Sequence, residues 1–336
     1  KKYIDYAAEI YGIYLQYISK DDIHVYSIDE VFIDITNYLN RYNCTARELA
    51  DKLMKAVLTG VGVRSSCGIG TNMYLAKIAL DLVAKKAADF IGYLDEEAYR
   101  EKLWDYEPLT DFWRIGPGTA GRLARYGITT MRQITQTDED FLQRLFGIDA
   151  ELLIAHAWGR EPVTIADIKA YKPESKSITS GQVLKRDYSF EEGKLIVREM
   201  LDLICLDLVD KGLVTGSVTI HIGYSNTLRA EPARGTASLG QETNIDSRII
   251  PAVLKTYDQI VNPSQQIRRL NISCNNVKPQ DKAPQQPSLF DSELDYKKMR
   301  RYYRRQRALI DIKARFGKNA ILKGMNLIQG ATTRER

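Results

Sequence analysis

Two short runs of β-branched and aromatic residues flank a pair of adjacent carboxylates, Asp29 and Glu30, within residues 23–36. In both runs apolar and polar residues alternate, which is the period of a strand with one buried face. The stretch therefore predicts a β-hairpin whose bend aims both acids at one point. Such a pair suits Mg²⁺, which proteins hold through one or two carboxylates together with substrate phosphates. The same dipeptide is also ordinary polar turn sequence, so the motif alone leaves both interpretations open.

Length and composition limit the class of protein. The chain has 336 residues and 44% hydrophobic content, enough for two or three domains with ordinary cores. It contains no run of eighteen apolar residues and no apolar segment after Lys1, so we expect a cytoplasmic protein without a membrane span. Only three histidines occur, and the four cysteines have no C-x-x-C spacing, which favours reduced structural thiols over a zinc site: Cys44, Cys67, Cys205 and Cys274.

The formal net charge of +5 is unevenly distributed. Residues 296–336 contain 13 Lys and Arg but only two acids, whereas the rest of the chain has 35 basic and 41 acidic residues. A cationic block of this kind is typical of a segment that contacts nucleic acid or another polyanion. The alternative is a solvated helix that keeps the protein in solution.

Several local signals describe the first part of the chain. Thr45 and Glu48 predict a capping box at the start of a helix that ends near Gly60 and Gly62. A strand expected at 63–70 ends in Gly-Ile-Gly and turns directly into a helix that carries Lys77. This order of strands and helices predicts a mixed sheet with helices packed on it.

From Pro108 the pattern changes to short helices interrupted by glycine. Between two of them lies Ile115-Gly116-Pro117-Gly118, which resembles the turn of a helix-hairpin-helix motif. Glycines there would let backbone N–H groups approach a phosphate at the start of a helix. Taken alone, Gly-Pro-Gly is also a common turn sequence.

The second half predicts another α+β domain. Residues 161–176 are polar and lack periodicity, as expected for a linker. Alternation and helical spacing then predict strand 177–187, helix 190–211, strands 214–225 and 235–243, helix 246–260 and strand 266–274. Residues 276–295 are rich in Pro and Gln, a composition that predicts disorder.

The order of these motifs resembles that of a Y-family translesion DNA polymerase, in particular the UmuC-like proteins of Gram-positive bacteria and their mobile elements. The resemblance covers about residues 1–275 and rests on Tyr26-Ser27-Ile28-Asp29-Glu30, Gly68-Ile69-Gly70-Thr71-Asn72 with Leu75-Ala76-Lys77, and Ile115-Gly116-Pro117-Gly118. It implies an α+β multidomain fold: a partial palm at 1–107, an all-α helix-hairpin-helix thumb at 108–160, a linker at 161–176, a little finger at 177–275, a disordered linker at 276–295 and a basic tail at 296–336.

The resemblance also implies an activity: error-prone synthesis past lesions in DNA repair and the SOS response, by nucleotidyl transfer to a primer 3′-hydroxyl with two Mg²⁺ ions. Asp29 would bridge the two ions, and Glu30 would hold the ion that activates the primer. Lys77 would contact the triphosphate of the incoming dNTP. In-line displacement at phosphorus requires charge neutralisation on the attacking and leaving oxygens, which agrees with this assignment. For Asp34, a structural or solvent-facing role is expected.

Partner sites follow from the same resemblance. Residues expected to contact primer-template DNA are Gly116 and Gly118 in the thumb and Lys176, Ser177, Lys185 and Arg186 in the little finger. Gln286-Pro-Ser-Leu289-Phe290 resembles the peptide by which bacterial polymerases bind the sliding clamp. Its apolar Leu-Phe pair lies in a polar linker with no core to join, which favours a partner pocket. Clamp tethering would raise the effective concentration of the polymerase at the primer end.

The sequence departs from the family at its start. The family pattern begins with a strand that carries another metal-binding Asp, followed by aromatic residues that exclude ribonucleotides and by a fingers domain. Only 25 residues precede Tyr26, so we expect an incomplete chain with little or no polymerase activity of its own. The alternative is a truncated paralogue that binds DNA and clamp without catalysis. A nucleic-acid-binding protein unrelated to polymerases is disfavoured, because paired carboxylates help a phosphate-binding surface only through a metal.

Overall fold

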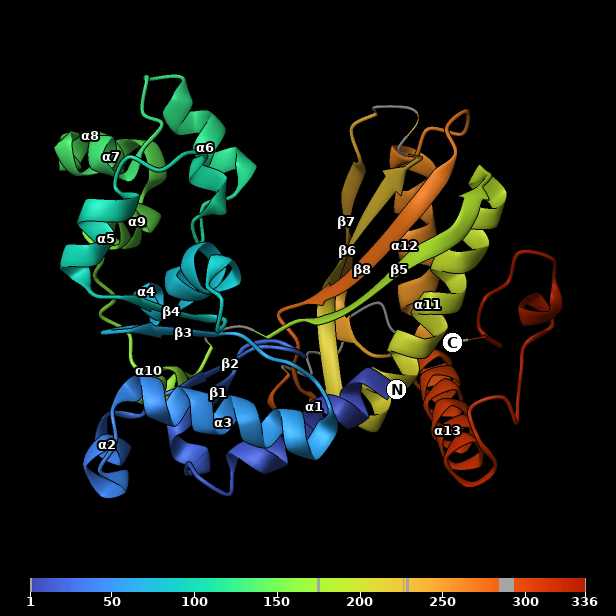
Figure 1. Cartoon of the computed structure of the whole chain (residues 1–336). Coiled ribbons are helices and arrows are strands. Elements are labelled where there is room, and N and C mark those ends of the chain that lie inside the picture. Colours follow the sequence, from blue (N-terminus) through green and yellow to red (C-terminus); the bar gives the residue numbers. More distant parts are fainter. Residues whose placement is uncertain (1, 174–175, 226, 228–229, 284–292, 336) are drawn as a thin grey trace. The chain divides into compact units, whose positions relative to one another are not determined.

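The computed structural model describes residues 2–173, 176–225, 227, 230–283 and 293–335, without the side chains of 293–296. The chain divides into two compact units, Lys1–Lys172 and Pro173–Arg336, here called the first and second unit (Figure 1). Each combines helices and strands, as the sequence predicts for an α+β protein. No helix in the described ranges has both the length and the apolar character that a membrane span requires.

The predicted acidic hairpin is present in the first unit. Strands β1 (Ile23–Val25) and β2 (Val31–Ile33) pair antiparallel, with His24 opposite Phe32. The loop between them holds Asp29 and Glu30. Three helices contribute to the small core beside this hairpin: α1 (Lys2–Tyr14), α2 (Thr36–Tyr42) and α3 (Ala46–Val61).

The predicted capping box of α3 is confirmed. The Thr45 hydroxyl accepts a hydrogen bond from the Glu48 N–H, and the Glu48 carboxylate accepts one from the Thr45 N–H at 2.8 Å. Gly62 follows the last residue of the helix, and its φ of +75° is a left-handed conformation that glycine adopts without strain. Each end of the helix is therefore marked by a local sequence signal.

A second pair of strands positions Lys77. Strand β3 (Cys67–Gly70) runs parallel to β4 (Ile91–Leu94), and α4 (Met73–Ile78) begins directly after β3 with its Leu75 N–H bonded to the Asn72 side chain. A Cβ on Gly70 would lie 2.2 Å from the Ala76 nitrogen, so only glycine allows this close strand-helix turn. The predicted single mixed sheet is wrong: β1–β2 and β3–β4 form separate two-stranded sheets in the described ranges. Alternation identifies a strand but not its partner.

Short helices complete the first unit and share a core with α4: α5 (Glu96–Leu103), α6 (Pro117–Ala124), α7 (Met131–Gln136), α8 (Glu139–Phe146) and α9 (Asp149–Ala157). The linker prediction for 161–176 requires correction, because residues Ile165–Ala170 form helix α10. Its capping box joins Thr164 to Asp167, whereas sequence searches usually look for Glu or Gln at the third position.

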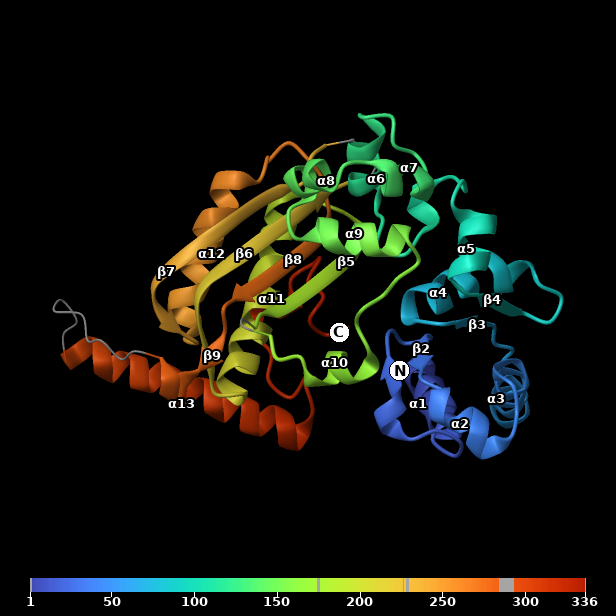
Figure 2. The ribbon, with the colours of Figure 1, turned by 90° about the vertical axis from the view of Figure 1, so that its left-hand side faces the viewer.

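In its described residues the second unit contains a five-stranded antiparallel sheet with the order β5-β8-β6-β7, in which β9 (Lys278–Pro279) pairs with β6. Helices α11 and α12 cover one of its faces (Figure 2). The bounds lie within two residues of those expected: β5 (Ile178–Tyr188), α11 (Phe190–Asp210), β6 (Leu213–Tyr224), β7 (Ala233–Thr243), α12 (Asp246–Ile260) and β8 (Ile267–Asn275). Long alternating strands and a capping box at Ser189 explain this agreement.

The C-terminal part is more ordered than its composition predicts. Strand β9 (Lys278–Pro279) pairs with the start of β6, and Val277 is buried, so the prediction of disorder is wrong for residues 276–283. Amino-acid composition gives only the mean hydropathy of a segment. It therefore does not reveal a short strand that pairs with an existing sheet. Residues 284–292, with the candidate clamp residues Gln286, Leu289 and Phe290, lie outside the described ranges. Within the predicted basic tail, α13 (Glu293–Phe316) packs against α11.

Candidate metal and nucleotide site

The acidic loop is held by its own hydrogen bonds. The N–H groups of Tyr26 and Ser27 both donate to the Glu30 carbonyl, at 3.0 and 3.1 Å. The Ser27 hydroxyl donates to Asp29 Oδ1 at 2.6 Å. Asp29 is exposed at the bend, whereas the Glu30 side chain is 31% exposed. The loop thus presents two carboxylates, one open to solvent and one turned toward the protein.

Lys77 meets the loop from α4. Its Nζ lies 2.7 Å from Glu30 Oε1 and 3.1 Å from Asp81 Oδ2, and its side chain is only 11% exposed. Burial by itself would lower the pKa of Lys77, but the hydrogen bonds to Glu30 and Asp81 raise it above its ordinary value. Lys77 therefore keeps its positive charge at neutral pH. The sequence predicted a nucleotide-binding role for Lys77 but not its contact with Glu30.

An aromatic cluster supports the same loop. The ring of Tyr26 lies edge-on to Phe32 at 5.6 Å and to Trp113 at 5.8 Å between centroids. Trp113 Nε1–H donates a hydrogen bond to the Tyr26 hydroxyl at 2.9 Å. Sequence reasoning missed Trp113, because no local spacing connects it with a residue 87 positions earlier. The cluster joins the acidic hairpin to the segment that leads into α6.

The donor set at the loop suits a hard cation. Asp29, Glu30 and the Ser27 hydroxyl offer oxygen atoms only, as Mg²⁺ prefers. Within the ranges that the structure describes, no three His, Cys, Asp or Glu side chains are grouped so that they could hold a metal ion. The two acids therefore fit an ion that completes its shell with water and phosphate oxygens, and they do not form a closed zinc-type site. The Oδ1 atom of Asp34 accepts a hydrogen bond from the Thr36 N–H at 3.0 Å, which agrees with a structural role for this side chain.

The predicted phosphate-binding turn is open to solvent. Gly116 precedes the first residue of α6, and a Cβ on Gly116 or Gly118 would meet no atom within 4 Å. A shallow hollow beside this turn is lined by Gly118 together with Arg122 and Arg125. The two arginines were missed by sequence reasoning, although their positions on the helix after the turn could have indicated them. A phosphate could reach both the backbone and these side chains.

The predicted DNA contacts of the second unit differ in their surroundings. Lys176 and Ser177 are exposed just before β5. Lys185 forms an ion pair with Glu335, and Arg186 pairs with Glu192 while its guanidinium lies 4.3 Å from the Tyr188 ring centroid. The open face of the sheet carries further exposed polar side chains that sequence reasoning missed, although they occupy outward positions of alternating strands: His221, Arg234, Arg269 and Asn271.

Comparisons with known proteins agree with these features. The model of the impB/mucB/samB family matches residues 1–81, and the model of its C-terminal domain matches residues 175–289. Two proteins of Bacillus subtilis (strain 168) align with 100% of this chain: UvrX, named for UV-damage repair, is 27% identical over 77% of its length, and DNA polymerase IV 2 is 28% identical over 78% of its length.

A solved structure of a chimeric Y-family DNA polymerase is similar in fold. Its TM-score is 0.57 at 18% identity, and the match covers 82% of this chain and 76% of the other. The two family-model matches lie in different units, one over the acidic loop and α4 and the other over the sheet of the second unit. This chain belongs to the impB/mucB/samB family, the UmuC-like members of the Y-family DNA polymerases.

Proposed function

We propose that this chain contains the acidic loop of an error-prone DNA polymerase of lesion bypass, with Asp29 and Glu30 as the ligands of catalytic Mg²⁺. The observation that carries the proposal is the contact between Lys77 and Glu30, because it brings a buried cation from α4 to the tip of the acidic hairpin. Metal-binding carboxylates and a phosphate-binding ammonium are required together for nucleotidyl transfer. The repair and polymerase names of UvrX and DNA polymerase IV 2 support the same activity.

Each residue has a distinct role in this proposal. Asp29, at the exposed bend, would hold the metal, and Glu30 would contribute the second carboxylate. Bound Mg²⁺ would neutralise charge on the attacking and leaving oxygens. Lys77 would exchange its bond to Glu30 for a triphosphate oxygen, which frees Glu30 for the metal. The Tyr26–Trp113 hydrogen bond would keep the loop in place during this exchange.

DNA would contact both units. In the first unit, the backbone at Gly116 and Gly118 would bind a phosphate. In the second unit, Lys176 and Ser177 are accessible, whereas Lys185 and Arg186 would exchange Glu335 and Glu192 for phosphates. Exposed ion pairs contribute only about 0–1 kcal/mol, so this exchange is energetically accessible. The peptide with Gln286, Leu289 and Phe290 would bind a sliding clamp.

The test compares Asp29→Ala with Asp34→Asn, a change of the nearby carboxylate that accepts the Thr36 N–H. We expect Asp29→Ala to lose Mg²⁺-dependent binding of a fluorescent dNTP and to keep duplex DNA binding, whereas Asp34→Asn should behave like the parent. Equal nucleotide binding by the parent and Asp29→Ala would exclude this metal site. Mg²⁺-dependent nucleotide binding that is lost in Asp29→Ala separates a polymerase site from a protein that binds DNA and clamp without these carboxylates.

A further inference from the structure

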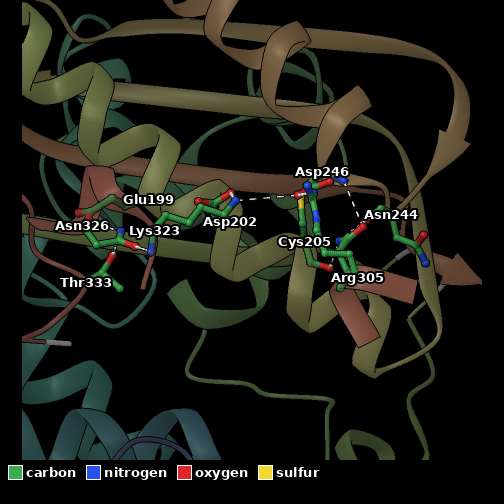
Figure 3. Close-up of polar contacts among 10 residues, drawn as sticks. Glu199, Asp202, Cys205, Asn244, Asp246, Arg305, Lys323, Asn326 and Thr333 are labelled. Atoms are coloured by element: carbon green, nitrogen blue, oxygen red, sulfur yellow. Dashed lines mark hydrogen bonds and ion pairs between the residues drawn. The ribbon is translucent and has the colours of Figure 1, made fainter. Parts of the chain in front are cut away.

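One side of helix α13 is occupied by its contacts with the second unit. The positions on that side recur with helical spacing: Met299, Tyr302, Gln306, Leu309 and Lys313. Gln306 is 1% exposed, and its Nε2 donates to the Asn244 carbonyl at 3.2 Å while its Oε1 accepts the Asp246 N–H at 3.5 Å. Arg305 also bonds to the Asp246 carboxylate (Figure 3). These bonds define which side of α13 faces outward.

The segment after α13 returns to the same unit. Glu199 is 2% exposed and accepts hydrogen bonds from Asn326 Nδ2 at 2.7 Å and from the Thr332 N–H at 2.8 Å. Lys323 bonds to Asp202 at 2.7 Å (Figure 3). The helix is therefore held by the segment that follows it as well as by its own contacts. It is a folded part of the second unit and not a free tail.

The outward side of α13 is strongly basic. Lys297, Arg300, Arg301 and Arg304 are all exposed. Arg300, Arg301 and Arg304 have no hydrogen bond or ion pair within the described ranges, whereas Arg305 pairs with a carboxylate. At 1.5 Å per residue, Arg300 to Arg304 span about 6 Å along the helix axis. The phosphates of one DNA strand rise about 3.4 Å per nucleotide along the duplex axis, so the three arginines cover about two such steps.

The side of α13 that packs against the second unit is not available to a membrane surface or a protein groove. A basic amphipathic helix binds a membrane surface or a protein groove by burying its apolar side. In α13, Gln306 is buried against the second unit, and Arg300, Arg301 and Arg304 are exposed on the opposite side. Guanidinium groups bind phosphates through paired hydrogen bonds. A polyanion with regularly spaced phosphates fits this surface best.

We propose that Arg300, Arg301 and Arg304 form an additional, sequence-independent contact for the DNA backbone. This inference rests on the proposed function, since it assumes a DNA substrate. The contact is separate from the open face of the sheet, because α13 packs on α11 in the helical layer. This contact gives the second unit two DNA-binding surfaces. The protein then remains bound to DNA when one of the two surfaces dissociates.

The experiment measures binding of the full chain to a fluorescent duplex over a series of salt concentrations. The test variant carries Arg300→Gln, Arg301→Gln and Arg304→Gln. We expect the test variant to bind the duplex more weakly. The slope of log affinity against log salt concentration should be shallower by about 2 to 3, because each lost phosphate contact changes it by about 0.9. The control carries Lys2→Gln, Lys55→Gln and Lys102→Gln, three exposed lysines of the first unit, and should keep the parental slope despite the same change in net charge.

Circular dichroism checks that the test variant is folded, as expected for three exposed side chains. An unchanged salt slope in a folded test variant would overturn the inference and leave the proposed function intact, provided that the parent binds the duplex. No duplex binding by the parent would overturn both. Vesicles with phosphatidylserine provide a further arm: loss of vesicle binding, with DNA binding retained in the test variant, would assign the surface to membranes and overturn the inference.

Discussion

At the scale of single residues, Glu192 shows how one carboxylate can serve two neighbours. It accepts the Ser189 N–H at 2.9 Å as part of the capping box of α11, and it pairs with Arg186. Hydrogen bonds from Arg186 and from the Ser189 backbone lower the pKa of Glu192 to about 2. An arginine expected to contact DNA is thus held at the start of a helix. Local stability and the proposed DNA contact are linked at this position.

The first prediction concerns Glu192→Gln, which keeps the cap but loses the charge. The folded-state pKa lies below the ordinary value of 4.5, so the ionised carboxylate stabilises the second unit above about pH 4.5 and loses this effect as the pH falls toward 2. We expect a loss of about 0.5–1 kcal/mol at pH 7 that disappears near pH 2. Urea unfolding over this pH range measures it, with Glu191→Gln as the control. A difference independent of pH would contradict the ion pair.

At the scale of elements, α13 has a buried polar anchor, Gln306. The Gln306 amide bonds to backbone groups that precede or begin α12, and its Nε2 also lies 3.5 Å from the Cys205 carbonyl of α11. These groups are buried and have little access to water. An uncharged side chain, together with the Arg305–Asp246 ion pair, therefore attaches this strongly basic helix to the second unit.

The second prediction concerns this anchor. Gln306→Ala leaves buried backbone groups without partners, so we expect the free energy of unfolding to fall by about 1–3 kcal/mol. Amide protons of α13 should then exchange faster in hydrogen-exchange mass spectrometry. Arg304→Ala, on the exposed side of the same helix, should change neither quantity. If the amide protons of α13 exchange as slowly in Gln306→Ala as in the parent, Gln306 is not the anchor of the helix.

At the scale of the whole molecule, each unit has its own hydrophobic core. Leu75 lies in the core of the first unit and Leu208 in that of the second, and both are fully buried. A unit that buries its own apolar surface can unfold cooperatively by itself. The proposed metal ligands and the larger sheet therefore lie in separately stabilised parts.

The third prediction follows from this division. Calorimetry of the full chain should show two unfolding transitions. Leu75→Ala and Leu208→Ala should each destabilise one unit by about 2–5 kcal/mol, through lost burial and a residual cavity. Each variant should shift only the transition of its own unit. A single transition shifted equally by both variants would show that the two units unfold together.

Most of the longer elements could be predicted from the sequence, because their signals are local. The capping boxes at Thr45 and Ser189 each join residues three positions apart, and the alternation of β5 and β6 extends over eleven and twelve residues. The short helix α10 and strand β9 were missed because their local signals are less typical. The capping box of α10 has Asp in place of Glu or Gln, and β9 has only two residues, which pair with β6.

The tertiary structure alone decided which side chains meet. Lys77 and Glu30 are 47 positions apart, Trp113 and Tyr26 are 87 apart, and Lys185 and Glu335 are 150 apart. No periodicity relates such positions, because these contacts form only when separate elements pack against one another. The sequence therefore identified the two acids and the lysine individually, and the folded chain determined that Lys77 is the partner of Glu30.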